Sequence, residues 1–67
     1  MYTLEQLRTG LTHMEENYAL AMDAGDYSLA SAFQDKIKWI WSELIRQIQA
    51  EDPYTTEADI RYFEGNH

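Results

Sequence analysis

Residues 27–48 read YSLASAFQDKIKWIWSELIRQI, and this stretch decides the fold. At about 100° per residue, as in an α-helix, its apolar side chains fall on one arc of about 160°. The arc contains Leu29, Ala30, Phe33, Ile37, Ile40, Trp41, Leu44, Ile45 and Ile48. A surface helix usually carries a stripe of about 100°, which one neighbour can cover. The stretch therefore predicts a helix that packs against more than one partner.

A first helix is expected upstream of this stretch. Its apolar residues recur at alternating spacings of three and four, the spacing of a coiled-coil seam: Leu4, Leu7, Leu11, Met14, Tyr18 and Ala21. Thr3 and Gln6 fit a capping box, in which each side chain bonds the other residue's backbone N–H. The pattern predicts a helix over residues 4–24.

The connection between the two helices is short. Gly25 suits the left-handed position after a helix, and Asp26 suits the cap of the next one. A turn of residues 25–26 implies an antiparallel hairpin, with the second helix over residues 27–50. Asp52 precedes a proline and is thereby pushed out of helical geometry, so the helix ends there.

Residues 1–52 are thus expected to form one helical hairpin, followed by an acidic C-terminal segment, residues 53–67. Thr56 and Asp59 can start a short helix over residues 57–63. Acidic side chains dominate the region, with Arg61 as its one basic residue. A short docked helix and an acidic tail both remain open at this point.

The chain is small for a stable monomer. Domains below about 70 to 80 residues usually need disulfides, a metal or a second copy. The 67 residues include no cysteine, and His13 and His67 are too few for a zinc site. Self-association is the remaining route, and the far edge of the wide arc supplies an interface for it: Tyr27, Trp41, Ile45 and Ile48. The expected architecture is an all-α hairpin that forms a homodimeric four-helix bundle.

The residues around the turn resemble a known motif. Ala21, Asp26, Tyr27, Ala30, Asp35 and Ile37 match the UVR motif, a helical hairpin found in UvrB, in UvrC and in some protease adaptors. The resemblance covers Tyr18 to Ile40. Ser28, Ser31 and Gln34 stand where the family usually has Glu, Ala and Arg. The resemblance implies a hairpin that pairs with another hairpin; it does not imply a role in DNA repair.

Composition excludes several classes of function. The net charge of −7 argues against direct binding of nucleic acid and favours a partner with a basic surface. No signal peptide and no apolar run of about 18 residues is present, so no membrane association and a cytoplasmic location are expected. His13 and Glu16 have the reverse order of a di-iron Glu-x-x-His motif, and no phosphate loop or nucleophile elbow occurs. We expect no cofactor, no metal and no enzymatic activity.

Trp39 lies outside the apolar arc, on the polar side of its helix with Asp35, Glu43 and Arg46. A tryptophan beside an arginine is typical of an interface hot spot. One hypothesis is that this group of four residues binds a partner. The other is that the C-terminal segment folds back and covers Trp39 with Tyr54, Ile60 or Phe63.

The sequence therefore favours a small acidic protein-binding module, either an adaptor or an inhibitor of another protein. Composition alone associates such chains with phage and mobile elements. An acidic DNA mimic is one alternative, because Glu15, Glu16, Asp23 and Asp26 gather near the turn and further acids follow residue 50. A purely structural oligomer is the other.

Overall fold

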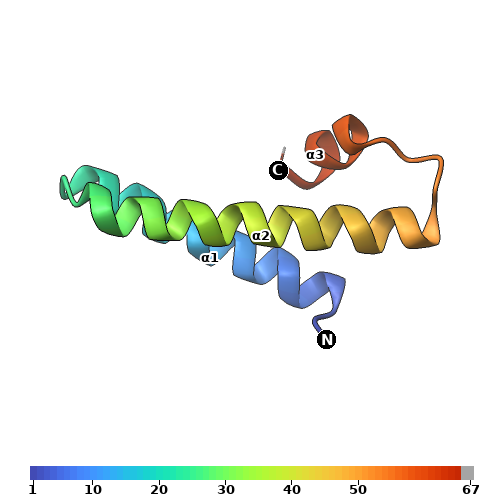
Figure 1. Ribbon diagram of the computed structural model, residues 1–67, viewed down its shortest axis with the longest axis horizontal. Coiled ribbons are helices and arrows are strands. Elements are labelled where there is room, and N and C mark those ends of the chain that lie inside the picture. Colours follow the sequence, from blue (N-terminus) through green and yellow to red (C-terminus); the bar gives the residue numbers. More distant parts are fainter. Residues whose placement is uncertain (66–67) are drawn as a thin grey trace.

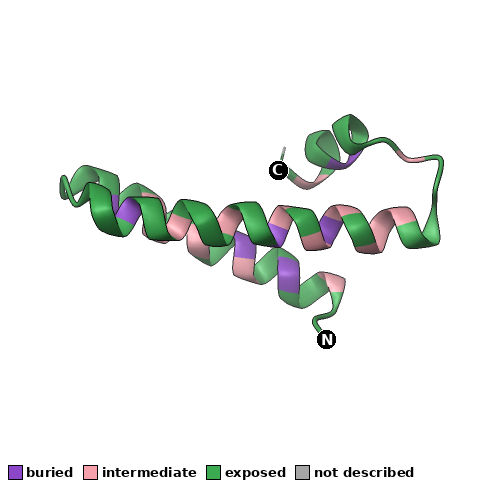
Figure 2. Ribbon diagram, in the orientation of Figure 1, coloured by how far each residue is buried: buried purple, intermediate pink, exposed green. Residues whose placement is uncertain are grey.

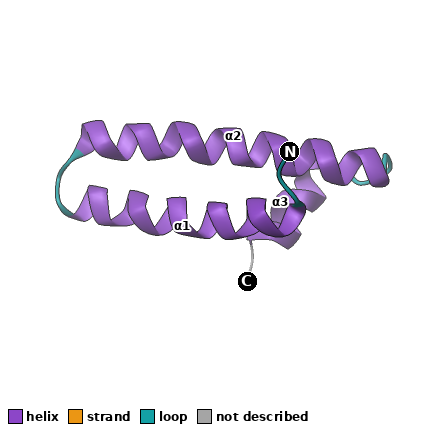
Figure 3. Ribbon diagram, turned by 90° about the horizontal axis from the view of Figure 1, so that it is seen from below, coloured by secondary structure: helices purple, strands orange, loops and turns teal. Residues whose placement is uncertain are grey.

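A computed structural model describes residues 1–65 of the chain, which form three helices. They are α1 (Leu4–Asp23), α2 (Tyr27–Glu51) and α3 (Glu57–Gly65). The two long helices pack side by side in antiparallel directions, and α3 turns back beside the C-terminal part of α2 (Figures 1 and 3). The expected all-helical hairpin is confirmed. Residues 66 and 67, including His67, lie outside the described part.

The start of α1 is fixed by the predicted capping box. The Thr3 hydroxyl accepts from the backbone N–H of Gln6 at 3.1 Å, and the Gln6 side chain accepts from the Thr3 N–H at 2.9 Å. Two backbone donors that the helix itself leaves unpaired are thereby satisfied. The capping box also fixes the direction in which residues 1–2 leave the helix.

The turn between α1 and α2 combines two caps. Gly25 has a φ of 72°, a conformation that L side chains rarely adopt. Its N–H donates to the Met22 carbonyl at 3.0 Å, and the Asp26 N–H donates to the Ala21 carbonyl at 2.9 Å. These are the two bonds of a Schellman motif. The Asp26 carboxylate then accepts from the Leu29 N–H at 3.1 Å, so α2 begins at once.

The core lies between α1 and α2, toward the open end of the hairpin. It consists of Leu7, Leu11, Ile40 and Leu44, with Leu4, Met14, Ile37 and Trp41 packed around it. Nearer the turn the buried residues are Ala21 and Ala30. Most of the other residues of both helices are exposed (Figure 2). Aliphatic packing therefore concentrates at one end of a long hairpin.

The C-terminal segment forms a docked helix, which decides between the two open alternatives. The Asp52 carboxylate accepts from the Tyr54 N–H at 3.2 Å and from the Thr55 hydroxyl at 2.7 Å, which shapes the reversal after α2. The Thr56 hydroxyl caps the start of α3. Ile60 is 2% exposed and holds α3 on the hairpin. α3 thus covers part of one face of the hairpin.

One ion pair joins the two ends of the chain. Arg8 of α1 donates to both carboxylate oxygens of Glu64 of α3, at 2.8 and 2.7 Å. This hydrogen bond, partly offset by desolvation, raises the pKa of Arg8 above its ordinary value, so the guanidinium stays charged. The pair fixes where the end of α3 lies across α1.

Candidate functional site

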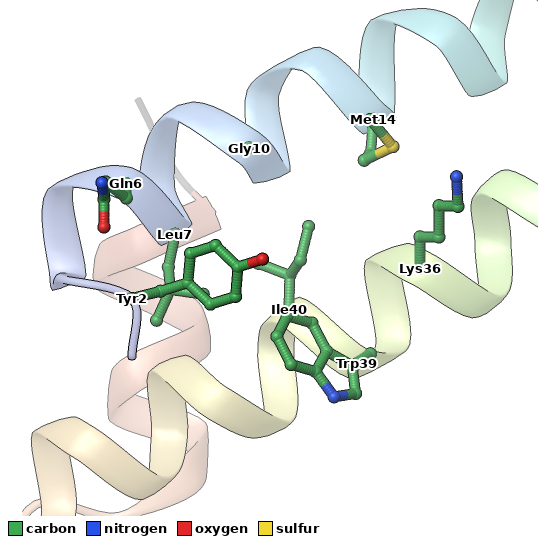
Figure 4. A pocket seen from close by; sticks show the side chains of 8 residues that line it. All are labelled: Tyr2, Gln6, Leu7, Gly10, Met14, Lys36, Trp39 and Ile40. Carbon is green, nitrogen blue, oxygen red and sulfur yellow. The ribbon is translucent and has the colours of Figure 1, made fainter.

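A groove opens between α1 and α2 beside Trp39. It encloses about 320 Å³, and the helices together with the N-terminal residues contribute its lining: Tyr2, Gln6, Leu7, Gly10, Met14, Lys36, Trp39 and Ile40. Figure 4 shows Tyr2 and Trp39 at one end and Met14 and Lys36 at the other, with Ile40 between the helices. The lining is mostly apolar, so the groove suits an apolar group of a partner.

Two aromatic rings shape the open end of the groove. The rings of Tyr2 and Trp39 meet edge to face, with centroids 5.8 Å apart and planes at 83°. Trp39 nevertheless remains 50% exposed. An indole held in place but still half in water offers apolar area to a partner at little cost in side-chain entropy.

Tyr2 is held by contacts that sequence reasoning did not find. The Gln47 side chain of α2 donates to the Tyr2 carbonyl at 2.8 Å, and the capping box follows directly at Thr3. The sequence did contain a signal for the position of Tyr2. Tyr2 directly precedes the capping box, and an apolar residue at that position often packs back onto its helix as a hydrophobic staple. Gly10 and Met14 of α1 become neighbours of Trp39 only through the pairing of α1 with α2, whereas Lys36 lies one turn before Trp39 on α2 itself.

The lining of the groove contains few side chains of the kinds that catalyse reactions. Lys36 is the charged residue of the lining, which includes no carboxylate and no histidine. The Lys36 ammonium lies 6.0 Å from the centre of the Phe33 ring, at the edge of cation–π range. Within residues 1–65, no group of three or more His, Asp or Glu side chains is placed to hold a metal ion. The groove therefore offers apolar contact and one cation.

The polar residues predicted to act with Trp39 lie near it on α2 without lining the groove. Arg46 donates to Glu43 at 2.6 Å, and this bond raises the pKa of the exposed Arg46. Asp35 is exposed one turn before Trp39. The structure places all four residues on α2, and a joint role in binding a partner stays a prediction.

The residues predicted to form an oligomer interface lie on another face, and α3 covers part of it. The Arg61 guanidinium lies 5.2 Å from the centre of the Trp41 ring, and a Cβ added at Gly65 would lie 3.7 Å from the same ring. Ile45 and Ile48 are half-buried, whereas Tyr27 is 68% exposed. The described contacts of the C-terminal segment with tryptophan are with Trp41 and not with Trp39, which the second hypothesis named.

The groove and α3 lie on opposite faces of the hairpin. Trp39 and Trp41 are two residues apart on α2, which is about 200° around a helix. The same holds on α1 for Arg8, which bonds α3, and Gly10, which lines the groove. Each long helix therefore contributes to two separate surfaces, one for the groove and one for α3.

Compared with known proteins, the chain matches no family model, no curated protein and no solved structure. None of the three described helices is long and apolar enough to cross a membrane. The function is therefore inferred from the two faces of the hairpin.

Proposed function

We propose that this chain is a small non-enzymatic protein-binding module, and that it binds its partner in the groove beside Trp39. The observation that carries the proposal is a half-exposed indole, steadied by Tyr2, beside a mostly apolar groove of about 320 Å³. Aromatic side chains of this kind dominate binding energy at protein interfaces. Burying apolar area contributes about 25 cal/mol per Å².

The ligand for the groove is an apolar side chain or short apolar segment of another protein. Lys36 at the far end of the groove suits a carboxylate or carbonyl oxygen of the bound segment. Outside the groove, the net charge of −7 favours a partner whose surrounding surface is basic. Both features agree with an adaptor or an inhibitor of another protein.

A pull-down tests the proposal. The full chain is used as bait in a lysate of the source cells, with Trp39→Ala and Tyr54→Ala as matched aromatic variants. Tyr54 is 93% exposed and does not line the groove. We expect Trp39→Ala to reduce capture of the partner at least tenfold and Tyr54→Ala to leave it unchanged, with helicity by circular dichroism the same in all three.

Other outcomes favour the other functions. If Trp39→Ala captures the partner as well as the wild type, the groove is not its binding site. Binding that falls steeply with salt and depends on Glu15, Glu16 or Glu57 rather than Trp39 favours a DNA mimic. Self-association with no foreign partner favours a structural oligomer.

Pairing of two hairpins into a four-helix bundle is a separate part of the proposal. The predicted interface runs along the face on which Trp41 lies, and α3 of the same chain already contacts Trp41. A second hairpin reaches Trp41 only after α3 has moved away. We therefore expect the homodimer to form when α3 is released and the chain to be monomeric while α3 is docked.

A further inference from the structure

Two rows of side chains run along the face of the hairpin that carries α3. Residues seven apart on a helix lie on nearly the same side, because seven residues make almost two turns. The rows are Arg8, Glu15 and Met22 on α1, and Trp41, Gln34 and Tyr27 on α2. Arg8 and Trp41, at one end of the rows, contact α3. The other four residues therefore lie on the same face, closer to the turn.

α3 covers only the end of this face that is remote from the turn. Figure 1 shows α3 beside the C-terminal part of α2, with the rest of that side of α2 uncovered. A hollow of about 290 Å³ follows the covered part, lined by Glu15, Tyr18, Gln34 and Ile37. Beyond it, Met22 is 41% and Tyr27 is 68% exposed. We name this uncovered surface the tip face: Glu15, Tyr18, Met22, Tyr27, Gln34 and Ile37.

The way α3 docks shows what kind of segment this face accepts. α3 is a short amphipathic helix that buries Ile60 and places the Arg61 guanidinium over the Trp41 ring. The tip face continues the same rows and presents aromatic rings again, at Tyr18 and Tyr27. Its length from residue 27 to residue 37 is about 15 Å, at 1.5 Å per residue. A helix of about ten residues fits there, end to end with α3.

The charge around the tip face selects the partner. Residues 14–35 include Glu15, Glu16, Asp23, Asp26 and Asp35 but no lysine or arginine. The last turn of α1 has no basic residue, although the helix dipole favours a cation there. The next bases along α2 are Lys36, which lines the groove beside Trp39, and Lys38, which lies one turn from Gln34 toward α3. The tip face itself thus has an acidic residue but no lysine or arginine, and a basic partner segment would complement it.

The arginines of the chain are already engaged elsewhere. They form ion pairs within the chain, namely Arg8 with Glu64, Arg46 with Glu43 and Arg61 with Glu57. A second copy of α3 is a poor match for the tip face, because Glu57, Asp59 and Glu64 outnumber Arg61. Charge complementarity thus favours a foreign segment over a second copy.

We propose that the tip face binds a short amphipathic helix of another protein, one that carries arginine or lysine around an apolar stripe. Apolar side chains of this helix pack on Ile37 and Met22, and its cations approach Glu15 and the rings of Tyr18 and Tyr27. This surface is separate from the groove beside Trp39, and binding at either one does not depend on binding at the other.

A calorimetric titration of the full chain with synthetic peptides tests the proposal. The probe is a capped twelve-residue helical peptide with leucine at i, i+3, i+4 and i+7 and arginine at the flanking positions. The control peptide carries glutamate in place of arginine. We expect saturable one-to-one binding of the arginine peptide and at least thirtyfold weaker binding of the glutamate peptide. Equal binding of both, or no saturable binding of either, would overturn the proposal.

Matched variants locate the site. We expect Glu15→Lys and Tyr27→Ser to weaken binding of the arginine peptide at least tenfold. Glu51→Lys makes the same change in net charge at the other end of α2, and Trp39→Ala removes the groove's indole; both should stay within twofold of the wild type. If Glu51→Lys weakens binding as much as Glu15→Lys, the attraction is unspecific and the proposal fails. A Glu15-dependent dimer of the chain itself that blocks the peptide would also overturn it.

Discussion

Gly10 lies in the second turn of α1 and lines the groove beside Trp39. A glycine inside a helix costs up to about 1 kcal/mol relative to alanine. A Cβ added at Gly10 would lie 3.7 Å from Ile40 Cδ1, which is ordinary van der Waals contact. Packing between α1 and α2 therefore tolerates alanine here, and the missing methyl group serves to widen the groove.

Gly10→Ala should raise the free energy of unfolding by about 0.5–1 kcal/mol, because it reduces the freedom of the unfolded chain. Gly25→Ala is the matched variant, and it should lower the free energy of unfolding by about 1 kcal/mol because the φ of 72° disfavours a Cβ. Urea titration followed by circular dichroism measures both. Destabilisation by Gly10→Ala would show that α1 and α2 approach too closely for a methyl group.

At the level of single residues, local sequence rules predicted the caps and failed for the groove. Thr3 with Gln6 and Asp26 with Leu29 make bonds within three residues, so the sequence motif is sufficient to predict them. The meeting of Tyr2 with Trp39 depends on how far α2 extends past the start of α1. Helical periodicity placed Trp39 away from the core but could not supply its ring partner.

Among the elements, α3 is the one whose position no tight turn fixes, whereas the turn at Gly25 sets α2 antiparallel to α1. The presence of α3 was predictable from Thr56 and from the apolar residues after it, whereas its location rests on a bond between residues 56 apart in the chain, Arg8 and Glu64. A bidentate pair of this kind, with Arg8 half-exposed, contributes about 1 kcal/mol. Burial of Ile60 and the contact with Trp41 supply the rest of the docking.

Ile60→Asp should release α3, because it places a carboxylate where a 2% exposed side chain now packs. Trp41 then becomes available to a second hairpin, and we expect sedimentation equilibrium to show a dimer at a total concentration where the wild type is monomeric. Ala58→Asp is the control, because it makes the same charge change at an exposed position of α3. A wild type that is already dimeric, or an Ile60→Asp chain that stays monomeric, would contradict this account.

On the scale of the whole molecule, the aliphatic core and the acidic residues of the turn region lie at opposite ends of the hairpin. The aliphatic core occupies the open end of the hairpin, where α3 also packs and where the arginines are paired. The region around the turn is held mainly by Ala21 and Ala30 and carries unneutralised acids. We expect the stable part of the fold to be the open end and the turn region to open more readily.

Leu44→Ala should remove a large share of the stability of the chain. Leu44 is 0% exposed in the centre of the core, and such truncations cost about 2–5 kcal/mol. A chain of this size has a total free energy of unfolding of about 3–10 kcal/mol. Leu20→Ala is the matched variant at a 67% exposed site, with an expected cost within about 0.5 kcal/mol. The midpoints of urea unfolding measure the cost of each substitution. Equal shifts of the midpoint for Leu44→Ala and Leu20→Ala would show that Leu44 is not in the core.

The placing of the two tryptophans on opposite faces gives the protein two optical reporters. In a Trp41→Phe chain the remaining indole lies beside Tyr2, so its fluorescence responds to events in the groove. In a Trp39→Phe chain the remaining indole lies under Arg61, so its emission follows the docking of α3. Tryptophan fluorescence can thus monitor each surface separately, in a chain that carries a single Trp-to-Phe substitution.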